Sequence, residues 1–378
     1  MASILAPAEA DLLRRVEALS DSFEPRAVEE YVALFSRVIA ERTGLWSARE
    51  LEERYRRIRQ PKRWEGDAGT IRTVFVLSRV TLGADIAVTS VLLDAARRRF
   101  PSARIVLSGG RKNYELFARE PRIEWLAVEY GRTAPLDQRL QAGLALRSRL
   151  DEPGAIVLDP DSRISQLGLL PICDERRYYF FESRTWGGDG PEPLAELARH
   201  WVGHALGVED ARPWLAPGES CQAPPGIAVS LGVGENPAKR VPGNFEARLL
   251  AGLARLGLPL LVDTGAGGDE AQRVERALET AGLAPPRAVA FRGPFAAFAA
   301  CIARSRLYVG YDSAGQHAAA AFGIPTVTIF RGFPCERFFA RWQPWGPGPR
   351  ATIRVEEGAD PRQVLEETLE AVRRLLGG

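Results

Sequence analysis

Apolar residues follow a helical period in the first part of the chain. They recur every three or four residues over residues 12–19 and 28–39, which is the spacing of an amphipathic helix. A third helix is predicted after Ser47, because Ser47 and Glu50 form a capping-box sequence in which each side chain bonds the main-chain N–H of the other. The pattern therefore predicts a helical extension over residues 1–65.

The period changes near residue 70, where short β-branched runs begin to alternate with helical stretches. Strands are predicted over residues 73–77, 104–108 and 155–158, and helices over residues 86–100, 113–119 and 194–206. A second series has strands over residues 227–230, 258–262, 289–291, 307–311 and 326–330, and helices over residues 245–256, 270–281, 296–303 and 315–322. Such alternation is typical of parallel sheets covered by helices on both faces. The predicted fold class is therefore α/β, with two doubly wound domains.

A proline-rich stretch between residues 211 and 226 has the composition of a linker. It separates a Rossmann-like domain over residues 66–215 from a second one over residues 226–355, which a last helix within residues 356–378 follows. Open α/β sheets bind ligands at the carboxyl ends of their strands. Two such domains predict a cleft whose site draws on both.

Composition excludes several classes of protein. The chain has 378 residues and a formal net charge of +2, which is too small for nucleic acid to be expected as the main partner. Its four cysteines are far apart and include no C-x-x-C pair, so we expect neither a zinc site nor a disulfide framework, and a reducing cytoplasm. No window approaches the roughly 18 uncharged residues of a transmembrane helix. Contact with a membrane would therefore be peripheral.

The loop after the first predicted strand, residues 78–85, is the first candidate for chemistry. It has one glycine, so the G-x-G-x-x-G fingerprint of a dinucleotide site is missing. It ends instead in Asp85, a carboxylate at the mouth of the sheet that could accept a proton from a substrate hydroxyl. The alternative is that Asp85 only caps the helix that follows.

Two further loops could bind an anion. Residues 232–240 carry glycines, which let a backbone approach an anion, and Lys239, a compact charge suited to phosphate, although the G-K-[ST] of a P-loop is absent. Residues 308–317 run from a strand directly into a helix, whose amino end attracts anions. There Asp312 could hold a ribose hydroxyl and His317 could add a hydrogen bond. The alternatives are an ordinary exposed turn at Lys239, a capping role for Asp312, and a His317 that packs beneath the helix.

Other patterns carry less weight. His200 and His204 are four residues apart but lack an evident third ligand, and the proline between Asp159 and Asp161 indicates a turn, so no metal is expected. The basic stretch over residues 54–63 is either an anionic-lipid or partner patch or a solvated helix face.

The third loop resembles a known family signature. The stretch YVGYDSAGQHAAAAFGIPTVTIF, residues 308–330, resembles that of family 9 glycosyltransferases, the group that contains the ADP-heptose:lipopolysaccharide heptosyltransferases. The loop ending at Asp85 with the following SVLLDAARRRFPSARI, AIVLDPDS, Lys239 and the loop around Glu270 match further family motifs in order. The resemblance covers about residues 72–350. It departs from the family at Ala84, which separates Gly83 from Asp85, and at Ala314 and Arg331, which stand where the family has glycine.

The resemblance implies a GT-B fold with the acceptor on the N-terminal domain, the donor on the C-terminal domain, and a final helix that crosses back onto the first. It implies Asp85 as the catalytic base, with Arg79, Thr81 and Gly83 in the loop on the acceptor side. The implied donor-binding residues are Gly234, Glu235, Lys239, Glu270, Asp312, Ser313, Ala314, Gly315 and His317.

The implied reaction is an inverting, metal-independent transfer of a sugar, heptose among the candidates, from a nucleotide-diphosphate sugar to a hydroxyl of a cell-envelope glycan such as lipopolysaccharide core. The expected donor is an ADP-sugar, with no further cofactor. The expected location is the cytoplasm, including the inner face of the membrane. Two alternatives stay open: a nucleotide-sugar epimerase or hydrolase of the same fold, and a nucleotide-binding scaffold without catalysis.

Overall fold

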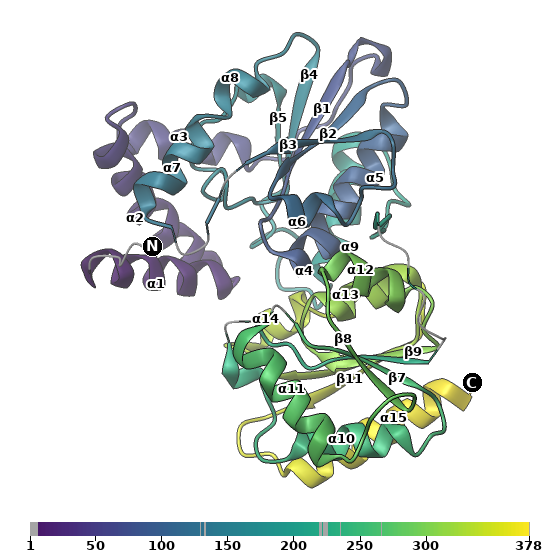
Figure 1. The fold of residues 1–378 in the computed structure, drawn as a ribbon. Helices are drawn as coiled ribbons and strands as arrows, with labels where there is room; N and C mark the ends of the chain where they lie inside the picture. The colour runs from purple at the N-terminus through teal and green to yellow at the C-terminus, as the bar shows by residue number, and fades with distance from the viewer. Residues whose placement is uncertain are drawn as a thin grey trace. The chain divides into compact units, whose positions relative to one another are not determined.

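The protein is described by a computed structural model that covers residues 7–128, 130–131, 134–218, 221, 226–234, 236–265 and 267–377. Contacts divide the chain into two compact units (Figure 1). Unit 1 contains the described residues of the ranges 1–114, 120–212 and 334–341, and unit 2 contains those of the ranges 115–119, 213–333 and 342–378.

Unit 1 is built on a five-stranded parallel sheet with the order β3-β2-β1-β4-β5. The strands are β1 (Thr73–Leu77), β2 (Arg104–Gly109), β3 (Ile123–Ala127), β4 (Ala155–Asp159) and β5 (Tyr178–Phe180). In register, Thr73 of β1 is opposite Arg104 of β2 and Ala155 of β4. The chain therefore changes direction across the sheet between β1 and β4, which is where open α/β sheets form ligand sites.

The helices of unit 1 include the predicted N-terminal ones. They are α1 (Pro7–Asp21), α2 (Pro25–Thr43), α3 (Ala48–Ile58), α4 (Leu82–Ala84), α5 (Ser90–Arg99), α6 (Arg111–Tyr114), α7 (Leu136–Leu144), α8 (Arg147–Leu150), α9 (Leu194–Leu206) and α14 (Glu336–Arg341), with a π-helical turn, η2 (Asp85–Thr89), and the 3₁₀ turns η1 (Ala68–Thr70) and η3 (Glu175–Arg177). The capping box of Ser47 and Glu50 is confirmed. The helix predicted over residues 113–119 is shorter and begins earlier, as α6 (Arg111–Tyr114). Residues 115–119 form turns instead, and their main chain pairs with Ala216 of the linker.

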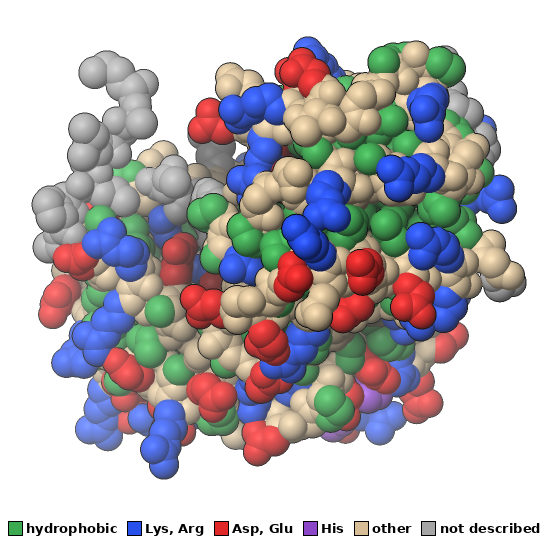
Figure 2. Space-filling view, turned by 90° about the horizontal axis from the view of Figure 1, so that it is seen from below, with side chains coloured by type: hydrophobic (Ala, Val, Ile, Leu, Met, Phe, Trp, Pro, Cys, Tyr) green, Lys and Arg blue, Asp and Glu red, His purple; other side chains and the backbone are tan. Residues whose placement is uncertain are grey.

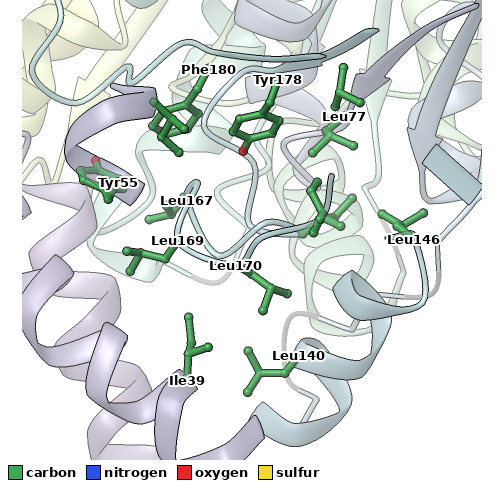
Figure 3. Close-up of a cluster of buried hydrophobic side chains, with 14 of the residues drawn as sticks. Ile39, Tyr55, Leu77, Leu140, Leu146, Leu167, Leu169, Leu170, Tyr178 and Phe180 are labelled. Carbon is green, nitrogen blue, oxygen red and sulfur yellow. The ribbon is translucent and has the colours of Figure 1, made fainter. Parts of the chain in front are cut away.

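The N-terminal helices share one hydrophobic core with the sheet. Figure 3 shows Ile39 of α2 and Tyr55 of α3 around the segment Leu167–Leu170, with Tyr178 and Phe180 of β5 above it. The hydroxyl of Tyr31 also donates to the carbonyl of Gln166 at 3.0 Å. The extension predicted over residues 1–65 is therefore an integral part of unit 1.

Unit 2 contains a six-stranded parallel sheet with the order β11-β10-β9-β6-β7-β8. Its strands are β6 (Ile227–Ser230), β7 (Leu260–Asp263), β8 (Ala288–Phe291), β9 (Leu307–Tyr311), β10 (Thr326–Arg331) and β11 (Arg350–Val355). Its helices are η4 (Pro237–Lys239), α10 (Phe245–Ala254), α11 (Gly268–Thr280), α12 (Phe295–Ile302), α13 (Ala314–Phe322) and α15 (Pro361–Gly377). This is the doubly wound order of a Rossmann fold, with its switch point between β6 and β9.

The C-terminal helix corrects one expectation. Helix α15 packs on α10 and on β9, β10 and β11, and four of its side chains, Val364, Leu365, Ala371 and Val372, lie in the core of unit 2. The segment that returns to unit 1 is α14, where Arg341 donates to the carbonyls of Gly190 and Glu192 at 2.8 and 2.7 Å. The pattern of apolar residues in α15 predicted a helix but not the unit against which it packs, because an apolar stripe can pack on any apolar surface of matching shape.

The cysteines correct another expectation. Cys221 and Cys301 form a disulfide across 80 residues of sequence, between the linker and α12. Cys173 and Cys335 are free thiols. Sequence spacing could not reveal the pair, because the two cysteines meet only after the linker packs on α12.

The surface agrees with the small net charge. Acidic and basic side chains lie among one another over most of the face shown in Figure 2. Within the described ranges, no helix is both long enough and apolar enough to cross a membrane.

Candidate functional site

The switch point of unit 2 brings together two residues from separate loops. Lys239 follows β6 and Asp312 follows β9, and these neighbouring parallel strands end at the same edge of the sheet. The Lys239 ammonium lies 2.6 Å from Asp312 Oδ2 and 3.2 Å from the Asp312 carbonyl oxygen. The Lys239 side chain is 18% exposed and that of Asp312 is 6% exposed, so the lysine is the more accessible member of the pair.

Helix α13 begins beside this ion pair without a side-chain cap. Ser313 occupies the N-cap position, but its side chain makes no capping hydrogen bond to the described helix. The two oxygens of the Asp312 carboxylate accept hydrogen bonds from Lys239 and from the amide nitrogen of Gln316. The capping alternative is therefore not what these side chains do here. The positive end of the α13 dipole lies at the sheet edge, where it favours a bound anion.

His317 is a packed side chain, which was the alternative to a role in hydrogen bonding to a ligand. Its side chain is buried on α13, and its ring lies edge-on to Trp342 with a centroid distance of 5.9 Å. Burial lowers the pKa of His317 to about 4, an effect that outweighs the attraction of the Asp312 carboxylate. The ring is therefore neutral at pH 7 and adds no positive charge to the site.

Glycines make room at the same edge. A Cβ built on Gly315 would lie 2.2 Å from the hydroxyl oxygen of Tyr308, so only glycine fits there. Gly234 has a φ of +59°, and no described atom lies within 4 Å of a Cβ built on it. Ala314 is the partly exposed first residue of α13. Glu235, a predicted donor-binding residue, lies outside the described residues.

Glu270 lies against two of the loops at this edge. A Cβ built on Gly232 would meet its Oε1 at 2.4 Å, and one built on Gly265 would meet its carboxyl carbon at 2.2 Å. The structure thus places Glu270 of α11 beside the loops after β6 and β7. Asp263, the last residue of β7, was not singled out from the sequence, and burial together with the nearby Glu270 charge raises its pKa to about 6. Its position at a strand end was the available signal.

Asp85 of unit 1 is enclosed rather than presented at the mouth of the sheet. It is fully buried in the π-helical turn, and its carboxylate accepts four hydrogen bonds. The donors are Ser78 Oγ, the Arg79 N–H and Thr89 Oγ1, each at 2.6 Å, and Asn113 Nδ2 at 2.5 Å. Burial raises the pKa of Asp85, although these hydrogen bonds oppose the shift. The capping alternative is wrong, because α4 already begins at Leu82.

Arg79 links the loops of unit 1 that follow β1, β4 and β5. Its Nη1 donates to the Pro160 carbonyl at 2.5 Å and to Ser183 Oγ at 2.8 Å. Ser183 in turn donates to Asp161 Oδ2, which also accepts from Arg184 Nε at 3.1 Å. Val80 and Asp161 both have positive φ, at 76° and 68°, a strained conformation for residues other than glycine.

The other residues of the predicted acceptor loop, Thr81 and Gly83, are partly exposed near the start of α4. Asp159 is buried and accepts from the Ser162 N–H at 2.7 Å and from the Tyr178 hydroxyl. No group of three His, Cys, Asp or Glu residues with metal-binding geometry occurs in the described part of the chain.

Several side chains of the basic stretch over residues 54–63, which begins in α3 and continues past its end, make contacts within unit 1. Arg54 donates to the Gly168 carbonyl, Arg57 makes two bonds to Glu175, and the Lys62 ammonium lies 4.2 Å from the centre of the Tyr179 ring. Arg56 and Arg57 have side chains that are 65% and 58% exposed, so this part of the stretch fits the solvated helix face, whereas the buried Arg54 does not. The patch for an anionic lipid or a partner stays a prediction.

Comparisons with known proteins identify the family and support the fold. The family described as glycosyltransferase family 9 (heptosyltransferase) matches residues 170–372. Escherichia coli ADP-heptose lipopolysaccharide heptosyltransferase II is 20% identical with a TM-score of 0.55, over 80% of this chain and 98% of that one. A family 9 glycosyl transferase from Veillonella parvula is 19% identical with a TM-score of 0.58, over 81% and 97% of the two chains.

A third similar structure is E. coli heptosyltransferase WaaC with ADP-2-deoxy-2-fluoro heptose, 15% identical with a TM-score of 0.55 over 81% of this chain and 99% of that one. No curated protein sequence matches. The family match spans more than half of the chain, so the chain belongs to glycosyltransferase family 9. It is a nucleotide-sugar glycosyltransferase with a GT-B fold of two Rossmann-like units.

Proposed function

We propose that the protein transfers a sugar, with heptose as the leading candidate, from an ADP-sugar to a hydroxyl group of a cell-envelope glycan, with inversion at the anomeric carbon. The observation that carries the proposal is the Lys239–Asp312 pair beside the uncapped amino end of α13. A cation and a helix dipole together form an anion site suited to a diphosphate.

The donor half of the reaction belongs to unit 2. Lys239 and the N–H groups at the start of α13 stabilise the negative charge that develops on the leaving nucleoside diphosphate, a charge that a metal ion neutralises in other enzymes. These N–H groups belong to the N-cap residue Ser313 and to Ala314 and Gly315. The Glu270 carboxylate accepts hydrogen bonds from the ribose hydroxyls, and Gly234 lets the main chain approach the ligand. His317 anchors α13 against Trp342 as a neutral ring.

The acceptor half belongs to the loop of unit 1 that contains Arg79, Thr81 and Gly83. The acceptor oxygen forms a bond to the anomeric carbon as the bond to the diphosphate oxygen breaks, and the hydroxyl proton passes to a base. Asp85 is the proposed base. Because four donors occupy its carboxylate in the described geometry, this role requires one side-chain donor, Ser78 or Thr89, to release it when the acceptor binds.

A thermal-shift panel tests the donor. ADP-, UDP-, GDP- and CMP-sugars are added separately, and a ligand that binds the native state raises the melting temperature. We expect the ADP-sugar to give the largest rise in the wild type and in the Lys112→Ala control, and little rise in Lys239→Ala. A panel in which no nucleotide sugar raises the melting temperature would overturn the proposal.

The enclosed Asp85 favours one second candidate, a nucleotide-binding protein without turnover. The two candidates differ in a single assay, in which the ADP-sugar is incubated with the protein and a full cell-envelope extract. The transferase releases ADP at a rate that depends on the extract. A binding protein releases none. The proposed location is the cytoplasm, where nucleotide sugars are available as donors.

A further inference from the structure

Arg331 joins the end of β10 to the loop that carries Lys239. Its Nη1 donates to the main-chain carbonyl of Ala238 and, at 2.9 Å, to that of Arg240. These two residues stand immediately before and after Lys239 in the chain. A single guanidinium therefore holds the main chain on both sides of the lysine.

Gly332 lies in close contact with the same short segment, at Ala238 and Lys239. Its φ is +69°, and a Cβ built on it would lie 2.6 Å from the carbonyl carbon of Ala238 and 2.9 Å from the Lys239 nitrogen. Asn236 fixes the segment from within, because its side chain accepts a hydrogen bond from the Ala238 N–H at 3.0 Å. The turn η4 is thus in close contact with Gly332 and hydrogen-bonded to Asn236 and Arg331.

The position of the Lys239 ammonium depends on this support. A lysine side chain is long and has many rotamers, so a cation delivered from a loose loop would sample many places. Here the main chain is fixed at Ala238 and Arg240, and the ammonium reaches Asp312 at 2.6 Å. Hydrogen bonds from a charged guanidinium to carbonyl groups are stronger than neutral ones, which suits them to hold a turn in place.

We propose that Arg331 is a positioning residue for the diphosphate site. It fixes η4 so that Lys239 is held ready for the phosphates, and it acts through Lys239 rather than by touching the ligand. The inference deepens the proposed function and rests on it, because it takes the ligand of Lys239 to be a nucleoside diphosphate.

The test is a double-mutant cycle measured by calorimetry. The proteins are the wild type, Arg331→Met, Lys239→Met and the double variant, and the probes are ADP and adenosine, with UDP and GDP run against their own nucleosides. Arg304→Met is the matched control, because Arg304 also donates through Nη1 to a main-chain carbonyl of unit 2, that of Cys221.

We expect Arg331→Met to raise the Kd for ADP by about tenfold, the effect of losing roughly one net hydrogen-bond contribution. Its Kd for adenosine should equal that of the wild type. The control Arg304→Met should bind both ADP and adenosine as the wild type does. The double variant should bind ADP no more weakly than Lys239→Met alone. Arg331→Lys, which keeps a donor near both carbonyls, should recover part of the affinity.

Three results overturn the inference. If the losses of ADP-binding free energy in the two single variants add up in the double variant, Arg331 contacts the phosphates itself. If Arg331→Met weakens adenosine as much as ADP, it acts on the whole unit and not through Lys239. If Lys239→Met weakens ADP binding while Arg331→Met does not, the inference fails and the proposed function stands. A wild type that binds no nucleoside diphosphate overturns the proposed function together with the inference.

Discussion

The Lys239 ammonium and the Asp312 carboxylate, 73 residues apart in the sequence, form an ion pair of 2.6 Å at the edge of the sheet in unit 2. The strand order creates the pair, since β6 and β9 are neighbours in the sheet although β7 and β8 lie between them in the sequence. The carboxylate is almost fully buried, so the lysine also stabilises the fold. Its loss would leave a buried negative charge without a cation.

Lys239→Met should therefore destabilise the protein by about 1–3 kcal/mol at pH 7, less than for a fully buried pair because Lys239 is partly exposed. Adding Asp312→Asn should restore most of that stability, because the uncompensated charge is then gone. Urea denaturation measures both effects. If the double variant is less stable than Lys239→Met, the penalty does not come from the unpaired carboxylate.

Asp85→Asn should cost about 2–4 kcal/mol of stability, because its amide group would face donors that now bind a carboxylate oxygen. If Asp85 is also the base, transfer should be lost while ADP binding is kept. Asp137→Asn is the control, since Asp137 pairs with Arg42 on the surface and such pairs contribute little. An Asp85→Asn variant with full transfer activity would exclude Asp85 as the base.

His317 should make the protein sensitive to acid. Its pKa is about 4 in the folded protein and about 6.5 when unfolded, so the neutral ring favours folding above pH 6.5 and this contribution is lost as the pH falls toward 4. The loss amounts to about 3 kcal/mol by linkage. In urea denaturation at pH 7.5 and 4.5, His317→Gln should lose less stability on acidification than the wild type, and the exposed-site control His200→Gln should behave as the wild type does. Equal losses in all three proteins would refute this role of burial.

The Cys221–Cys301 disulfide should leave two of the four cysteines reactive when the unreduced protein is denatured and titrated with a thiol reagent. Breaking it by reduction or by Cys301→Ala should lower stability by about 2–4 kcal/mol, because it closes a long loop in the unfolded chain. Cys173→Ala serves as the control for removing a sulfur atom. Four reactive thiols in the protein isolated from its natural compartment would show that the bond does not form there, since disulfides are rare in a reducing cytosol.

Much of the fold follows from local pattern. The alternation of strands and helices predicted every strand of unit 2 except β11 and three of the five in unit 1, and short strands such as β5, with three residues, are too brief for any period to show. The loops of Lys239 and Asp312 also follow from local pattern, because each comes directly after a buried strand and carries glycine close to it in the chain. The position of these two loops at one edge of the sheet could therefore be predicted from the sequence, while their role in binding a donor stays a prediction.

The surroundings of Asp85 and of Lys239 depend on contacts between residues that are far apart in the sequence. Asp85 follows a strand as Asp312 does, yet Ser78, Thr89 and Asn113 enclose it, and no spacing distinguishes an enclosed carboxylate from an open one. The support of Lys239 by Arg331 likewise joins segments more than 90 residues apart.

The sequence by itself determined two parallel α/β series, the loops at their carboxyl edges and the family signature around Asp312, because these are properties of neighbouring residues. The tertiary structure alone decided that Asp85 is enclosed, that α15 packs within unit 2 while α14 returns to unit 1, and that Cys221 meets Cys301. Whether a side chain is buried, and which residue it contacts, depends on the segments that the strand order brings together. These segments are far apart in the sequence, so local pattern does not identify them.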